Sequence, residues 1–360
     1  MSLSPSPAER RARARADLRM GLPVCLTADG TSALVAAVET LTPIRFEELT
    51  TGADAVLAIT ARRAETLKAR PYDGDLARIV LAPGATLSWA QSVADPADDL
   101  SDPMKGPFRT ERDGSANLHR SAIALAKEAR LLPAILLRPL RSSEDATALD
   151  LTTLDLATDD VPRNAATYAE VVSARLPMEL ARAGRLHIFR PNDGGEEHYA
   201  VEVGQPDRDQ PVLARLHSAC FTGDLLGSLK CDCGPQLRAA LAAMGQEGAG
   251  ILLYLNQEGR GIGLANKMRA YSLQDQGFDT VEANHRLGFE DDERDFRIGA
   301  ALLREMGFSS VRLMTNNPAK IDMMRAQGVE VIERVPLKVG HTKENATYLA
   351  TKAAKSGHLL

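Results

Sequence analysis

Three of the four cysteines of this chain lie in two neighbouring segments, His217-Ser218-Ala219-Cys220-Phe221-Thr222-Gly223-Asp224 and Leu229-Lys230-Cys231-Asp232-Cys233-Gly234. An odd-numbered, close group of cysteines does not suit disulfide pairing, and a chain without an export signal keeps its thiols reduced. The pattern therefore predicts a metal site built from the three thiolates.

The number of ligands decides what kind of metal site this is. Cys220, Cys231 and Cys233 alone would leave one position of a zinc ion for water, as in catalytic sites, whereas structural zinc takes four protein ligands. His217 is the candidate for a fourth ligand. A further alternative is that the cysteines are simply small buried hydrophobic residues, but charged residues between them indicate an exposed loop. We expect one zinc ion per chain.

Around the cysteines, short apolar runs alternate with amphipathic segments, which predicts an α/β domain with a mixed sheet and flanking helices over residues 171–360. The predicted strands are 186–190, 199–203, 212–216, 251–255, 311–314 and 329–335. The predicted helices are 236–246, 261–275, 296–305 and 318–326.

The first half, residues 1–170, also reads as an α/β domain. Its predicted strands are 55–59, 79–81 and 134–137, and its predicted helices are 32–40, 61–69 and 123–130. The acid-rich segment 95–106 lacks periodicity, so we expect a solvated loop there, with a Mg²⁺ site as the alternative.

Length and composition set limits on the type of protein. A chain of 360 residues suits two domains, and 44% hydrophobic with 25% charged residues is typical of globular proteins. No apolar run approaches the roughly 20 residues that span a bilayer. The net charge of −5 gives no general reason to bind nucleic acid, so an anionic substrate would need a local basic site. We therefore expect a cytoplasmic protein without nucleic-acid or membrane partners.

Three further polar clusters follow the cysteines. The glycine-rich turn Gln257-Glu258-Gly259-Arg260-Gly261-Ile262-Gly263-Leu264 either exposes amide groups to an anion or only shapes the chain. The run Asp291-Asp292-Glu293-Arg294-Asp295, taken alone, is typical of a solvated helix start. The segment Thr315-Asn316-Asn317-Pro318-Ala319-Lys320 links a strand to a helix and suits a phosphate or a purine edge.

The run from Arg215 to Leu360 resembles GTP cyclohydrolase II in many motifs that occur in one order. They are Cys220…Cys231-Asp232-Cys233-Gly234, Gln257-Glu258-Gly259-Arg260, Arg269-Ala270-Tyr271, Leu273-Gln274-Asp275-Gln276-Gly277, Asp279-Thr280-Val281-Glu282-Ala283-Asn284 and Gly357-His358-Leu359-Leu360. The resemblance implies that zinc on the three cysteines serves hydrolysis at C8 of guanine, with release of formate. Tyr271 would help to position that chemistry.

The resemblance also assigns roles at the phosphates. Asp292 matches the family's proton acceptor, and Arg294 matches its proposed nucleophile at the α-phosphorus, from which pyrophosphate leaves with help from Mg²⁺. An arginine nucleophile is unusual because guanidinium is protonated at neutral pH, so Asp292 makes physical sense as its base.

The same matching implies a set of positions that contact GTP. They are Arg215, Leu216, His217, Ser218, Ala219, Gln236, Glu258, Gly259, Arg260, Thr280, Thr315 and Lys320. The Glu258 carboxylate would accept from the N1–H and exocyclic amine of guanine, which adenine does not offer. Three positions depart from the family: Ala219 replaces a usual Glu, Lys230 an Arg, and Asn256 an Arg that is often present. These departures indicate weaker GTP binding or an altered rate or product.

The first half resembles 3,4-dihydroxy-2-butanone 4-phosphate synthase remotely, at residues 18–24 and 131–137. That family needs an acidic run after its first strand, whereas Thr27-Ala28-Asp29-Gly30-Thr31-Ser32 stands here. Its Gly-His-Thr-Glu motif aligns with Asn117-Leu118-His119-Arg120, and a shift by one residue would preserve only His119. We expect a degenerate, non-catalytic domain kept for folding or dimerisation.

These observations predict a homodimeric GTP cyclohydrolase II of riboflavin biosynthesis. Its products would be 2,5-diamino-6-ribosylamino-4(3H)-pyrimidinone 5′-phosphate, formate and pyrophosphate. One alternative is a paralogue with another product or pathway, such as pyrimidine breakdown. The other is a non-catalytic guanine-nucleotide-binding regulator, against which the intact Tyr271, Asp292 and Arg294 argue.

Overall fold

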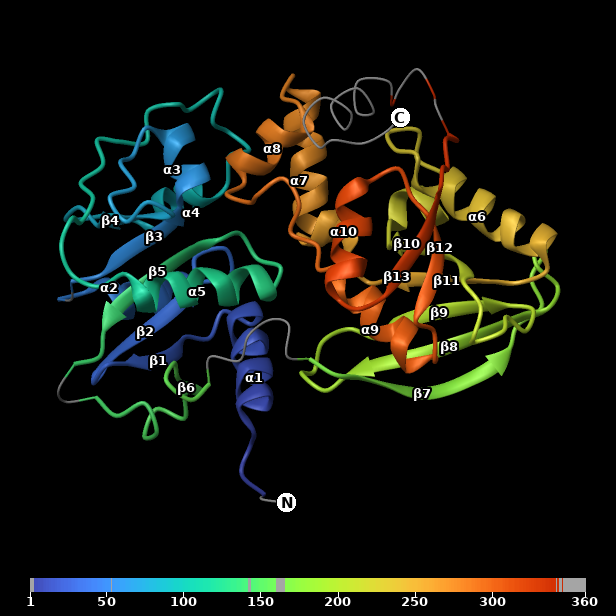
Figure 1. Ribbon diagram of the computed structural model, residues 1–360. Coiled ribbons are helices and arrows are strands. Elements are labelled where there is room, and N and C mark those ends of the chain that lie inside the picture. Colours follow the sequence, from blue (N-terminus) through green and yellow to red (C-terminus); the bar gives the residue numbers. More distant parts are fainter. Residues whose placement is uncertain are drawn as a thin grey trace. The chain divides into compact units, whose positions relative to one another are not determined.

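The computed structural model divides the chain into two compact units (Figure 1). It describes residues 3–52, 54–141, 144–159, 166–340, 342 and 345. The first unit combines Met1–Pro162 with Ala265–Glu293, and the second combines Arg163–Leu264 with Arg294–Leu360. This division differs from the contiguous domains 1–170 and 171–360 expected above, because a segment of the second half belongs to the first unit. The family motif at the chain end, residues 357–360, lies outside the described residues.

A six-stranded sheet of order β4-β3-β5-β2-β1-β6 forms the centre of the first unit. Its strands are β1 (Val24–Ala28), β2 (Thr31–Ala37), β3 (Val56–Thr60), β4 (Leu76–Val80), β5 (Ala134–Pro139) and β6 (Thr153–Asp155). All neighbouring pairs are antiparallel except β1 with β6. The helices of this unit are α1 (Pro7–Arg19), α2 (Pro43–Thr50), α3 (Ala61–Leu67), α4 (Leu87–Ala94), α5 (Asn117–Glu128), α7 (Leu264–Asp275) and α8 (Thr280–Arg286).

The helix predicted over residues 32–40 is wrong, because β2 occupies this segment. Asp29 and Gly30 have positive φ angles of 50° and 74° and join β1 to β2 as a two-residue hairpin turn. The residues from Ala33 to Ala37 are all buried, so the run has no polar side that would separate a strand from a helix by periodicity. The Asp-Gly pair was the better local signal.

The loop predicted at 95–106 is present, but one of its acids is not solvated. Asp99 is buried and accepts hydrogen bonds from Arg63, whose Nη1 lies 2.5 Å from Oδ2, and from Lys105. Arg286 adds a third cation at 3.3 Å. Buried charges need opposite charges around them, so the pairing of this carboxylate with three cations holds the loop in place. No group of potential metal ligands in the described part of the chain includes Asp99.

Replacing Asp99 with alanine should destabilise the first unit strongly. The Arg63 and Lys105 cations would stay buried without their carboxylate, which costs about 3–5 kcal/mol of unfolding free energy. Urea unfolding of the full chain measures this change. Asp98→Ala is the matched control, since Asp98 is exposed and its loss should change stability by less than about 0.5 kcal/mol. Equal effects of the two substitutions would contradict the structural role of Asp99.

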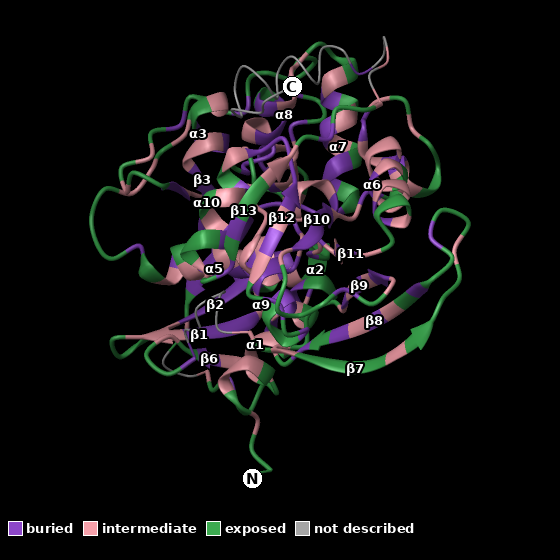
Figure 2. Ribbon diagram, turned by 45° about the vertical axis from the view of Figure 1, so that its right-hand side comes forward, coloured by how far each residue is buried: buried purple, intermediate pink, exposed green. Residues whose placement is uncertain are grey.

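The second unit contains a seven-stranded mixed sheet of order β13-β12-β10-β11-β9-β8-β7, which confirms the predicted fold class. Its strands are β7 (Tyr168–Arg175), β8 (Gly184–Pro191), β9 (His198–Val203), β10 (Val212–Ser218), β11 (Gly250–Leu255), β12 (Ser310–Met314) and β13 (Glu330–Val335). The four strands β13, β12, β10 and β11 run parallel, and the remaining pairs are antiparallel. The sequence did not predict β7, an edge strand that is largely exposed and lacks an apolar face (Figure 2).

Helices cover both faces of the parallel strands. The helical segments of the second unit are η1 (Phe221–Leu225), α6 (Cys233–Glu247), η2 (Glu258–Gly261), α9 (Arg297–Glu305) and α10 (Pro318–Ala326). Helix α6 packs with Leu213 on one face, whereas α9 and α10 pack with Leu216 and Leu313 on the other. The connections after the adjacent strands β10 and β12 therefore leave toward opposite sides. In parallel sheets, ligands bind at the carboxyl ends of such strand pairs. None of the helices in the described ranges is long and apolar enough to cross a bilayer.

Candidate active site

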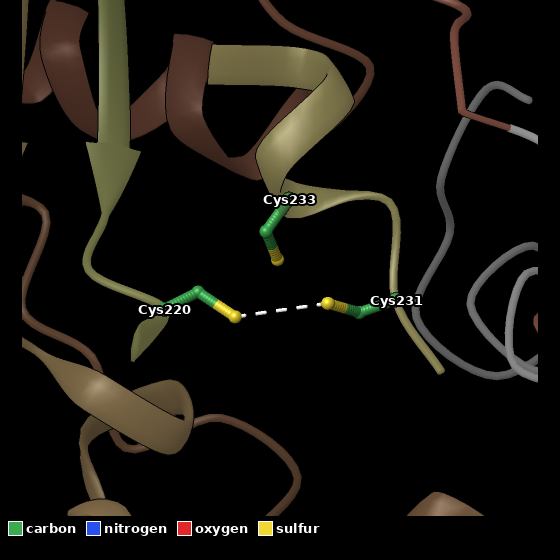
Figure 3. Close-up of side chains that lie close together, drawn as sticks. All are labelled: Cys220, Cys231 and Cys233. Atoms are coloured by element: carbon green, nitrogen blue, oxygen red, sulfur yellow. Dashed lines mark hydrogen bonds between the residues drawn. The ribbon is translucent and has the colours of Figure 1, made fainter. Parts of the chain in front are cut away.

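The three clustered cysteines converge at the carboxyl end of β10. Cys220 lies two residues after this strand, Cys231 lies two residues before α6, and Cys233 begins that helix; their side chains point toward one another (Figure 3). The sulfur atoms of Cys220 and Cys231 are 3.7 Å apart, and all three sulfur atoms lie within 4.8 Å of one another. Such spacing suits a single metal ion with three sulfur ligands.

A glycine keeps the space between the sulfur atoms open. A Cβ atom built on Gly223 would lie 2.7 Å from the sulfur of Cys231 and 3.0 Å from that of Cys220. Hydrogen bonding to Cys220 raises the pKa of Cys231, and contact with both other thiols together with burial raises the pKa of Cys233. A cation is therefore needed to favour thiolates here, and three thiolates fit zinc.

His217 does not supply a fourth ligand. Its Nε2 atom lies 3.0 Å from each carboxylate oxygen of Asp224, and no other histidine, cysteine or acid in the described chain joins the sulfur group. Burial lowers the pKa of His217, so the ring is neutral. The alternative of a closed structural zinc site thus finds no support in this geometry.

Asp224 connects the elements around the cysteines and was not identified from the sequence. Besides His217, it accepts hydrogen bonds from the Cys220 N–H and the Tyr254 hydroxyl, both at 3.0 Å. The His217 and Tyr254 rings stack with centroids 5.6 Å apart. The only local signal was a conspicuous acid in the Thr-Gly-Asp segment, and its partner Tyr254 lies 30 residues away.

Two buried cations lie at the carboxyl ends of β10 and β12. The Arg215 Nη1 donates to the Met314 carbonyl at 3.0 Å, and its Nη2 donates to Gln236. The Lys320 Nζ donates to the Leu216 carbonyl at 3.0 Å from the first turn of α10. Burial lowers the pKa of Arg215 to about 10, which still leaves it charged at neutral pH. This is the local positive charge that an anionic substrate requires.

The glycine-rich turn after β11 does not present a row of amides to a ligand. Gly261 and Gly263 donate within the turn, to the carbonyls of Gln257 and Glu258 at 3.2 Å and 3.0 Å. The amides of Gly261 and Gly263 are thus occupied within the turn, which favours the interpretation that these glycines shape the chain. Arg260 has a φ of 59°, a left-handed conformation that costs a non-glycine residue about 1–2 kcal/mol and is often found at functional sites.

The turn does fix one predicted side chain firmly. The Glu258 carboxylate is buried and accepts from the Phe221 N–H at 2.6 Å, while its other oxygen accepts from the Gly259 N–H at 3.0 Å. Phe221 directly follows Cys220, so Glu258 is tied to the cysteine loop.

Other predicted residues of the second unit lie near these strand ends. Arg294 contacts Ser218, with 3.5 Å between Nη1 and Oγ, and its guanidinium lies 4.7 Å from the centre of the Phe296 ring. Ala219 donates its N–H to a β11 carbonyl at 2.8 Å, and Thr315 accepts from the backbone just before α10. Three predicted residues, namely Tyr271, Thr280 and Asp292, belong to the first unit.

Comparisons with known proteins agree with this geometry. The family model described as GTP cyclohydrolase II matches residues 169–336. A GTP cyclohydrolase-2 from Azospirillum brasilense is 44% identical over 358 residues, which cover 96% of this chain and 93% of that protein. The chain belongs to the GTP cyclohydrolase II family.

Relatives in the GTP cyclohydrolase II family differ in length. A GTP cyclohydrolase-2 from Neisseria meningitidis is 55% identical over 190 residues, which cover 53% of this chain and 95% of that protein. That relative therefore has no room for a second unit of this size, whereas the Azospirillum protein extends along both. A two-domain 3,4-dihydroxy-2-butanone 4-phosphate synthase from A. baumannii covers 92% of this chain at 16% identity, but the TM-score of 0.33 supports no conclusion.

Substituting Gly223 with alanine should remove the metal from this GTP cyclohydrolase II. The added methyl group would enter the space between the sulfurs, so the zinc content should fall from about one ion per chain to a small fraction. Metal analysis of the purified protein measures this. Gly227→Ala is the control, because no atom lies within 4 Å of its added carbon although its φ of 66° makes it strained. Retention of zinc by the Gly223 variant would contradict the proposed metal position.

Proposed function

We propose that this chain is a GTP cyclohydrolase II that converts GTP to 2,5-diamino-6-ribosylamino-4(3H)-pyrimidinone 5′-phosphate, formate and pyrophosphate in riboflavin biosynthesis. Membership of the family supports the reaction. The observation that carries the proposal is the convergence of three cysteine sulfurs without a fourth side-chain ligand, within the part of the chain described. A zinc ion held there would supply Lewis acidity and an activated water for hydrolysis.

The buried cations would receive the triphosphate. Arg215 and Lys320 lie at the strand ends where parallel sheets bind ligands, and Arg294 lies near the same β10 end through its contact with Ser218. We assign Mg²⁺ to the GTP phosphates, since it binds phosphate oxygens with few protein ligands. Gln236 supports this arrangement by accepting from Arg215 and donating to Asp232 at 2.5 Å.

Glu258 would select guanine. Its carboxylate is already oriented by two backbone N–H groups, which fixes the direction in which it can accept from a base. Guanine offers N1–H and an exocyclic amine as donors, whereas adenine lacks this pair of donors and would bind more weakly. The acceptor atom of the neutral His217, Nδ1, lacks a hydrogen-bond partner among the described residues and would take a further substrate donor.

The remaining assignments follow the family resemblance. Tyr271 would position the hydrolytic chemistry, Asp292 would accept a proton, and Arg294 would act as nucleophile at the α-phosphorus. A guanidinium must lose a proton before it can act as a nucleophile, and Asp292 would accept that proton from Arg294.

The departures at positions 219, 230 and 256 raise the question of product. Asn256 donates to the Glu197 carbonyl at 2.5 Å and its N–H binds His198, so this side chain supports β9 instead of supplying a charge. Ala219 provides no carboxylate beside Cys220. The second candidate function is therefore a paralogue that stops before formate is released, in which case the pyrimidine product would retain a formyl group.

Incubation with GTP tests the proposal directly. We expect formate, pyrophosphate and the pyrimidine in equal amounts, with activity lost on treatment with a zinc chelator and in Cys231→Ala, since each removes the metal. Cys25→Ala is the matched control, because Cys25 is buried in the first unit far from the cluster along the chain and should leave turnover intact. Pyrophosphate without formate would favour the paralogue, and absence of any turnover by the zinc-loaded chain would refute enzymatic function on GTP.

We further propose that the first unit is a degenerate dihydroxybutanone phosphate synthase-like domain without that activity, and that the chain works as a cytoplasmic homodimer. His119, the one preserved motif residue, is buried, and burial lowers its pKa to about 4. A ring enclosed in the core is not accessible to a sugar phosphate, and its low pKa leaves it without a positive charge to bind one. The purified chain should therefore form no dihydroxybutanone phosphate from ribulose 5-phosphate and Mg²⁺, and detectable product would contradict this assignment.

A further inference from the structure

Residues 265–293 form a segment that leaves its own half of the sequence. Helices α7 and α8 make up most of it, and the chain enters it from the second unit after Leu264 and returns to that unit at Arg294. We call it the α7–α8 segment. It packs with the N-terminal residues as one compact unit, so its position depends on side chains that precede it by more than a hundred residues.

Helix α7 is fixed by an arginine with two acidic partners. The Arg269 Nη2 lies 3.0 Å from a Glu39 carboxylate oxygen, and its Nε lies 3.0 Å from one of Asp95. Glu39 in turn accepts the Leu132 N–H at 2.7 Å, which ties it to the loop before β5. The fully buried Asn266 donates to the Arg130 carbonyl at 3.0 Å. These contacts determine both the position and the rotation of α7.

Helix α8 and the residues after it are fixed as well. The Thr60 hydroxyl donates to the Gly288 carbonyl at 2.8 Å, and both groups are buried. Gly288 approaches so closely that an added Cβ would lie 2.9 Å from Pro133 and from Thr60. Lys127 pairs with Glu293 at 2.6 Å, and Arg286 pairs with the buried Asp99. In Figure 1, α8 lies beside α3, which agrees with their contacts.

The α7–α8 segment carries three positions to which the proposed function gives a role in GTP turnover. Tyr271 follows Arg269 by two residues on α7, Thr280 begins α8, and Asp292 precedes Glu293. From this placement we propose that the first unit acts in the reaction as a holder of these residues, with Glu39 and Asp95 as positioning residues. The inference rests on the proposed function and gives the unit a task that needs no chemistry of its own.

A purely stabilising role would predict something different. If the first unit only protected the second from unfolding, loss of Glu39 and Asp95 would lower the fraction of active enzyme, and kcat would fall without a change in KM. If instead Thr280, a proposed GTP contact, and Tyr271 are misplaced, both kcat and KM change, and they change in every enzyme molecule. Small displacements of positioning groups can cost up to about a hundredfold in rate.

The test is the double variant Glu39→Gln/Asp95→Asn in the full chain. Both substitutions keep shape and remove the charges that bind Arg269. We expect kcat for formate release to fall about tenfold and KM for GTP to rise about fivefold. Zinc content should stay the same, and amide hydrogen exchange should speed up within residues 265–293 but not at β10 or α6.

The matched control is Asp75→Asn/Glu128→Gln. It makes the same two chemical changes in the same unit. Asp75 pairs with Arg120 and Glu128 pairs with Arg11, and neither arginine belongs to the α7–α8 segment. Both kinetic constants and the exchange of the segment should remain within about twofold of the original, as expected for changes at sites without coupling.

The outcomes separate this inference from the proposed function. Unchanged exchange in the segment, or faster exchange with unchanged kcat and KM, would overturn the holding role. A fall in kcat at constant KM would also overturn it in favour of simple stabilisation. If the original chain releases no formate from GTP at all, the proposed function fails, and exchange of the segment in the absence of substrate still decides whether Glu39 and Asp95 hold it.

Discussion

The close approach of backbone to sulfur at Gly223 is the constraint on which the metal site depends. Three cysteines can surround a single ion only if nothing else occupies the middle, and the η1 turn passes through that region with a residue that has no side chain. The same turn meets α6 tightly, since a Cβ on Gly234 would lie 2.1 Å from the Gly223 carbonyl oxygen. The loop after β10 and the first turn of α6 therefore fix each other, which fixes the spacing of the three sulfur atoms.

Asp224 extends this rigid arrangement into the sheet. By accepting from the Cys220 N–H, the Tyr254 hydroxyl and the His217 ring, it joins the cysteine loop to β10 and β11. The Asp224 carboxylate at Nε2 also determines which tautomer the His217 ring adopts, and it occupies the nitrogen that could otherwise bind a metal. The openness of the sulfur site and the orientation of His217 thus have a common cause.

The sequence predicted those features whose signal is local. The cysteine spacing, the strands β10 to β13 and the helices α6, α7, α9 and α10 could be predicted because their apolar periodicity or residue type is complete within a few residues, whereas the short helix α8 was not predicted. Segment 32–40 was wrongly predicted as a helix because an alanine-rich run that is buried on both faces shows no hydrophobic periodicity. The edge strand β7 was not predicted because it is exposed, and the two interpretations of the glycine turn could not be separated because the partners of its amides depend on backbone conformation.

Partners that are distant in the sequence had no such signal. Arg269 pairs with Glu39 across 230 residues, and nothing in either neighbourhood distinguishes this pair from ordinary surface charges. The same holds for Asp99, which resembled a member of a solvated acidic loop until its cations were located. Charge pairs formed by tertiary structure can be recognised only when the fold brings them together, which is why the packing of the α7–α8 segment against N-terminal residues could not be predicted.

The contrast between two kinds of polar residue in the first unit gives the holding role its physical basis. His119 is enclosed in the core, and neither of its ring nitrogens has a hydrogen-bond partner among the described residues. Glu39, Asp95 and Asp99, in contrast, each bind a cation of the α7–α8 segment. The two pairs of Arg269 are partly exposed and so add little to stability, whereas their two contacts on one guanidinium restrict the orientation of α7. In the first unit, the geometry that the pairs of Arg269 and Arg286 fix is that of the helices bearing Tyr271 and Thr280.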